Sequence, residues 1–155
     1  LCTALKLPLR EKMWVLFLFP CSGIIRVAQH FLHFRHLSLA LGQHYENKML
    51  SCVASESQRL LAVRIGRVVE LTARYTPWRC QCLVQANMAR ILLGLYSIPY
   101  ILHIGVSPRH SSENLFKAHA WVKVGPWVIV GAGSIQDYTL ISSWIPPNWD
   151  IDSEN

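Results

Sequence analysis

The chain has 155 residues, of which 52% are hydrophobic and 15% charged, and its formal net charge at pH 7 is +6. This length is enough for one domain with a sizeable core and too short for two ordinary ones. The sequence has no zinc-finger spacing, no RNA-recognition motif and no lysine/arginine tract, which argues against a nucleic-acid-binding protein. We interpret the positive charge as a solvated basic face, with an acidic partner as the alternative.

The first apolar stretch, Met13 to Ile25, is shorter than the ~20 residues needed to cross a bilayer. Basic residues precede it, as in a signal peptide, but no small-residue cleavage site follows. We expect a helix that packs on the domain or on a partner protein. Superficial membrane association is the less favoured alternative.

Residues 24–41 are predicted to continue as a helix, in which His30, His33 and His36 lie near one face. No carboxylates lie near them, so we expect a polar edge rather than a metal stripe. The polar segment Gly42 to Ala54 is predicted to be a loop. The chain thus divides into an N-terminal helical segment, residues 1–54, that packs on the core or on a partner, and a core, residues 55–155, within one compact domain.

Ser55 to Gln58 fits a capping box and begins the clearest amphipathic helix, which is predicted to run to about Tyr75. Its apolar positions recur at helical spacing, which predicts a core helix that packs against the helix that follows.

The next segment turns from an extended approach into an apolar helix. Pro77 cannot continue the preceding helix, and from Leu83 onward apolar residues recur at helical spacing, with Gly94 as the expected stop. Cys82 is therefore predicted in the first turn, where free backbone N–H groups and the helix dipole stabilise a thiolate. Cys82 is our candidate nucleophile.

Three β-prone segments follow: residues 100–106, whose imperfect alternation is typical of a central strand, then 116–124 and 127–130. Alternation in the second of these places His119 on the face opposite Ala118 and Ala120. Asp137 comes next, just before a further β-prone run. A cysteine that opens a helix, followed by a histidine and a carboxylate on strands, is an order that can assemble a Cys-His-Asp triad.

The oxyanion of an acyl-transfer reaction needs preorganised donors, and the backbone N–H of Cys82 is the natural one. Trp78, Gln85 and Trp121 are secondary candidates for the substrate cleft, although packing roles explain them equally well.

The five cysteines are odd in number and irregular in spacing, which favours free thiols in a reducing cytosol over a disulfide framework. Cys80 and Cys82 suggest a metal site together with His103, His110 or His119. The paired two-residue spacing of a structural zinc site is missing, so we expect no metal and no cofactor. Cys80 is either a resolving thiol or, more simply, a half-buried bystander.

Two stretches, RCQCLVQANMARILLGLYSIPYILHIGV and FKAHAWVKVGPWVIVGAGSIQDYTLI, resemble the lasso peptide biosynthesis B2 proteins. These are stand-alone leader peptidases of the bacterial transglutaminase-like superfamily. The matching features are the Cys-Leu pair that opens a helix, the Gly-x-Tyr-x-Ile-Pro junction, the His-x-Gly-Val strand and the Ala-His-Ala-Trp-Val strand. The resemblance extends over about Arg59 to Ile141.

The resemblance implies an α+β fold of the papain/transglutaminase type, with helices packed on a small antiparallel sheet. It further implies a cytoplasmic cysteine peptidase that removes the leader from a ribosomally made lasso precursor peptide. Cys82 would be the nucleophile, His119 the general base and acid, and Asp137 the residue that orients the imidazole. Some relatives have an acidic residue in place of Lys123, or an Asp near the position of Gly131, so the third member of the triad stays open.

The resemblance also implies partners. A separate leader-binding protein, B1, would present the precursor, and an ATP-dependent cyclase would use the amine that cleavage releases. Two other classes of function remain open: another thiol acyl transfer on the same triad, such as amide cross-linking, and a non-catalytic partner-binding domain.

Overall fold

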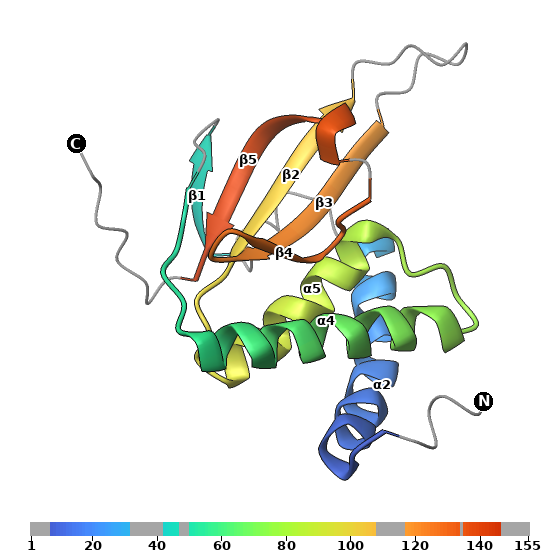
Figure 1. The fold of residues 1–155 in the computed structure, drawn as a ribbon. Helices are drawn as coiled ribbons and strands as arrows, with labels where there is room; N and C mark the ends of the chain where they lie inside the picture. The colour runs from blue at the N-terminus through green and yellow to red at the C-terminus, as the bar shows by residue number, and fades with distance from the viewer. Residues whose placement is uncertain (1–6, 32–41, 47–49, 108–116, 134, 147–155) are drawn as a thin grey trace.

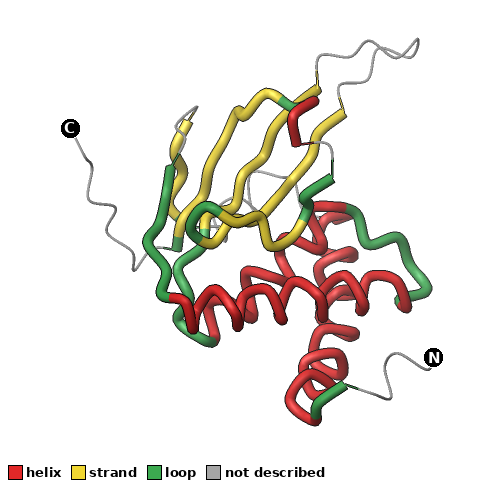
Figure 2. The backbone as a smooth tube through the Cα atoms, viewed as in Figure 1, coloured by secondary structure: helices red, strands yellow, loops and turns green. Residues whose placement is uncertain are grey.

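The computed structural model describes residues 7–31, 42–46, 50–107, 117–133 and 135–146. In these ranges three α-helices pack on one side of a five-stranded antiparallel sheet (Figure 1). The predicted α+β class is therefore confirmed. The helical layer and the strand layer are separated clearly in the backbone trace (Figure 2).

The sheet has the strand order β1-β5-β2-β3-β4, so the predicted central strand, β2, does lie in the middle. Every neighbouring pair is antiparallel. Irregularities in register occur between β2 and β5 and between β3 and β4. The strands are β1 (Gln43–Glu46), β2 (Ile101–Ser107), β3 (Lys117–Val124), β4 (Trp127–Val130) and β5 (Thr139–Ile145).

Strand β1 corrects the prediction of a loop from Gly42 to Ala54. Its four residues are polar and mostly exposed, so they show none of the alternation that identifies a half-buried strand in sequence. The strand forms because its backbone pairs with β5, with Gln43 opposite Ile145 and Glu46 opposite Ser142. This pairing joins the predicted N-terminal segment to the sheet of the core.

Helix α4 (Glu56–Tyr75) begins as predicted. The Ser55 side chain accepts a hydrogen bond from the backbone N–H of Gln58, and the Gln58 side chain accepts one from the backbone N–H of Ser55. Gly66 allows α4 to approach β4 closely, because a Cβ at this position would lie 2.4 Å from the carbonyl oxygen of Ile129. The capping box thus sets where the helix starts, and the glycine sets how closely it packs.

Helix α5 (Cys82–Leu95) contacts β3, β4 and both other helices, which makes it the central helix of the fold. Its fully buried side chains include Val84, Met88 and Leu93. The helix ends one residue beyond the predicted stop at Gly94, and the left-handed conformation is taken by Ser97 (φ 51°).

Helix α2 (Leu9–Phe31) is continuous through Pro20 and packs on α4 and α5 through Trp14, Leu18 and Ser22. This confirms that the first apolar stretch packs on the domain. By length and composition α2 could also cross a membrane. The rest of the predicted helix, residues 32–41, lies outside the described residues. Its outward side carries exposed apolar side chains, among them Leu9, Met13, Leu16, Ile24, Val27 and Phe31.

Candidate active site

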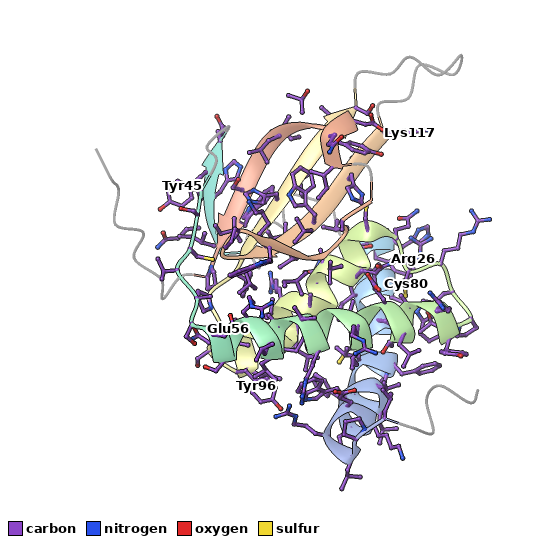
Figure 3. The ribbon with its side chains drawn as sticks, in the orientation of Figure 1. Arg26, Tyr45, Glu56, Cys80, Tyr96 and Lys117 are labelled. Atoms are coloured by element: carbon purple, nitrogen blue, oxygen red, sulfur yellow. The ribbon has the colours of Figure 1, made fainter. Side chains whose placement is uncertain are left out.

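Cys82 is the first residue of α5, where the backbone changes from extended to helical. The N-cap residue, Gln81, has φ −63° and ψ 164° and makes no side-chain capping hydrogen bond. Its amide oxygen instead accepts a hydrogen bond from Arg26 of α2 at 3.2 Å; Arg26 lies near Cys80 beside the start of α5 (Figure 3). First-turn N–H groups have no partner within a helix, so this end of α5 is suited to stabilise a thiolate and an oxyanion.

The loop before Cys82 is held by side chains that we considered for the cleft. The Gln85 amide donates a hydrogen bond to the carbonyl oxygen of Cys80 at 2.9 Å. The Trp78 indole donates one to the Ser22 hydroxyl of α2 at 3.1 Å, and its ring lies over Gly23. Both side chains therefore fix the approach to Cys82, and neither lines the cavity described next.

Cys82 and His119 line one cavity of about 330 Å³ between the start of α5 and the sheet. Apart from this thiol and this imidazole, no side chain that lines the cavity is ionisable. An apolar wall beside two polar reactive groups is typical of a small-molecule or peptide-binding cleft. The wall is formed by Leu83, Ile104, Ala118, Ala120, Ile141 and Trp144.

The imidazole of His119 is held by the backbone and by two aromatic rings. Its Nε2 lies 2.9 Å from the carbonyl oxygen of Gly131. A carbonyl only accepts hydrogen bonds, so this contact assigns the proton of the neutral ring to Nε2 and leaves Nδ1 as the acceptor. The ring of Tyr138 is centred 5.1 Å away, and that of Trp121 lies stacked at 6.0 Å.

Asp137 lies in a short 3₁₀ helix, η1 (Ile135–Asp137), directly before β5. Its side chain is exposed and is not among the residues that line the cavity. The structure thus brings Cys82 and His119 to one cavity and does not bring Asp137 there.

Trp121, our third secondary candidate for the cleft, is buried between two histidines. It is 5% exposed, and its ring lies 5.5 Å from that of His103 on β2 as well as 6.0 Å from that of His119. Gly105 makes room for it, because a Cβ there would lie 3.0 Å from the indole. Trp121 therefore supports the face that carries His119 and does not line the cavity.

The remaining thiols and histidines were candidates for a metal site. Within the ranges that the structure describes, no three His, Cys, Asp or Glu side chains gather as metal ligands; His33, His36 and His110 lie outside those ranges. The described cysteines are free thiols. Cys80 lies 3.2 Å from the Thr76 hydroxyl, and burial raises the pKa of the Cys52 thiol, as expected for a packing residue.

Comparison with protein families adds an independent result. The family model of the transglutaminase-like superfamily matches residues 28–143. The chain belongs to this superfamily. The match includes Cys82, His119 and most of the sheet, and members of the superfamily typically use a cysteine for acyl transfer or proteolysis. Comparisons with curated proteins and with solved structures give no significant match.

One contact in this transglutaminase-like domain was missed by sequence analysis. The carbonyl of Gly131 is the observed hydrogen-bond partner of His119, whereas residue types alone directed attention to carboxylates. The only available signal was the Gly-Ala-Gly segment directly after the strand of residues 127–130, because glycine permits the positive φ that turns a chain sharply.

Proposed function

We propose that this transglutaminase-like domain is a cysteine peptidase that removes the leader from a ribosomally synthesised lasso precursor peptide. The observation that carries the proposal is the shared cavity: Cys82 at a helix start without a side-chain cap, and His119 with Nδ1 left to accept a proton. The resemblance of both stretches to lasso B2 proteins supports the choice of substrate.

The site residues support an acyl-enzyme mechanism. His119 takes the thiol proton, and the Cys82 sulfur attacks the scissile carbonyl carbon to form a tetrahedral intermediate. First-turn N–H groups of α5 donate to the oxyanion. The C–N bond breaks as His119 returns the proton to the leaving amine, which becomes the free N-terminus of the core peptide. Water then attacks the thioester with His119 as base, and the leader leaves as a carboxylic acid.

The lining of the cavity supports a preference for a peptide with an apolar side chain beside the scissile bond. Ile104, Ile141 and Trp144 offer it contact area and no charge. Burying a charged substrate side chain among them would carry an uncompensated desolvation cost. The chemistry needs no cofactor, and the free thiol it depends on suits a reducing cytoplasm.

The structured part of the domain is small, and we propose that a separate B1 protein binds the leader and presents it to the cleft. The freed amine would pass to the ATP-dependent cyclase. Omitting B1 from the reaction is the direct test of the first step, since equal cleavage with and without B1 would contradict it.

The decisive experiment compares Cys82→Ala with Cys80→Ala in cleavage of the precursor, followed by mass spectrometry. We expect Cys82→Ala to abolish cleavage, whereas Cys80→Ala retains it because the Cys80 thiol does not line the cavity. Cleavage by Cys82→Ala at the wild-type rate would refute the proposal.

Superfamily membership also makes amide cross-linking a second candidate. The same mass spectra distinguish it, because hydrolysis adds water across one peptide bond and cross-linking releases ammonia. If His119→Ala leaves biological function intact while disruption of the exposed face of α2 abolishes it, the domain is instead a non-catalytic binding module.

A further inference from the structure

We infer that the backbone carbonyl of Gly131, and not a carboxylate, is the group that positions the imidazole of His119. This inference rests on the proposed function, because it assigns the third component of the same site. Its observation is the 2.9 Å contact between Nε2 of His119 and the carbonyl oxygen of Gly131. Gly131 is thus a positioning residue that acts through His119.

The backbone at Gly131 is built for this contact. Its φ is +81°, a conformation that L side chains rarely adopt. A Cβ here would lie 2.6 Å from the carbonyl oxygen of Ala120 and 3.0 Å from Cα of Trp121, both on the neighbouring strand β3. Only glycine fits, and it lies directly after the last residue of β4, Val130, where the chain leaves the sheet.

Two aromatic rings restrict the imidazole further. Tyr138 and Trp121 lie against the ring of His119, with interplanar angles of 34° and 23°. Packing therefore limits rotation of the ring, while the carbonyl selects the Nε2–H tautomer. Together they leave Nδ1 as the nitrogen that can exchange a proton with Cys82.

The chemical consequence is tautomer selection without an opposite charge. A carboxylate would both fix the tautomer and stabilise the imidazolium, whereas a neutral carbonyl fixes the tautomer and provides less charge stabilisation. The Asp137 carboxylate is then not required for either role.

The experiment compares Gly131→Ala, Gly133→Ala and Asp137→Asn with the wild type. Gly133 is the matched control, because it follows two residues later and a Cβ there would meet no atom within 4 Å. The first readout is the ¹⁵N chemical shifts of the His119 ring at neutral pH, which report the tautomer. The second is the rate at which iodoacetamide alkylates Cys82, mapped by mass spectrometry.

We expect a single Nε2–H tautomer in the wild type, in Gly133→Ala and in Asp137→Asn. In Gly131→Ala we expect a mixture of tautomers and alkylation of Cys82 slowed at least ~10-fold, since a wrong histidine tautomer severely impairs nucleophile activation. A tautomer change or a comparable loss in Asp137→Asn overturns the inference. If Gly131→Ala does not fold, the wild-type and Asp137→Asn spectra still decide.

Failure of the proposed function would look different. In that case Cys82 of the wild type would be alkylated no faster than Cys80 and would be indifferent to His119→Ala, whatever tautomer His119 has. The tautomer spectra test only the role of Gly131.

Discussion

Two histidines on neighbouring strands show what separates a structural imidazole from one available for chemistry. His103 on β2 lies directly opposite Trp121 on β3, and His119 is two residues from Trp121 on the same strand, so both rings share one face of the sheet. Both stack against the same indole, at 5.5 Å and 6.0 Å, and both make one hydrogen bond through a ring nitrogen.

The difference lies in burial and in what the second nitrogen faces. His103 is 2% exposed and bonds through Nδ1 to the Ser143 hydroxyl at 2.8 Å. Burial, with a smaller effect from nearby Lys123, lowers the pKa of His103 to about 4. His119 is half-buried and opens on the cavity that Cys82 also lines. Access to a reactive partner therefore separates the two residues, whereas residue type and strand do not.

The largest expected effect comes from replacing each histidine in turn. His119→Ala should lower the rate of precursor cleavage by ~10²–10⁴-fold, the usual contribution of a general acid–base residue. His103→Gln should change the cleavage rate only a few-fold, because its side chain does not line the cavity. Steady-state cleavage of the precursor, with circular dichroism to confirm folding, makes the comparison. A folded His103→Gln as inactive as His119→Ala would contradict it.

A second prediction concerns stability at low pH. The unfolded chain protonates His103 near its ordinary pKa of 6.5, whereas the folded chain protonates it only near 4. The unfolded state therefore binds more protons between these values, and the stability contributed by neutral His103 is full above pH 6.5 and lost as pH falls to 4. The loss should be on the order of 3 kcal/mol.

Urea unfolding at pH 7, 5.5 and 4.5 measures this loss. His103→Gln should flatten the dependence of the unfolding free energy on pH across that window, because the replacement does not titrate. An unchanged slope in the variant would show that His103 is not the group responsible.

Local signals predicted much of this fold because each depends on residues close together in sequence. The capping box at Ser55 fixes the start of α4, and Pro77 followed by apolar helical spacing places Cys82 at the start of α5. Alternation predicts β3 and the opposite facing of His119 and Ala120. Family membership, found independently, agrees with this assignment of elements.

The contacts that sequence analysis missed join distant segments or involve only backbone atoms. Strand β1 depends on pairing with β5, about a hundred residues later, and its polar residues carry no strand pattern. The partner of His119 is a carbonyl, which every residue possesses, so residue types cannot identify it. Only the three-dimensional path of Gly131 shows which carbonyl reaches the imidazole.

The smallest expected effect tests the hydrogen bond that holds the structural histidine. Ser143 is fully buried, so Ser143→Ala leaves a buried nitrogen of His103 without this partner and should lower the unfolding free energy by about 1 to 2 kcal/mol. The matched control is Ser142→Ala, whose hydroxyl bonds to His44 at an exposed position and should cost about 0.5 kcal/mol or less. Urea unfolding at pH 7 measures both. Equal losses would mean that the Ser143 bond does not hold His103 in place, and that burial alone separates it from His119.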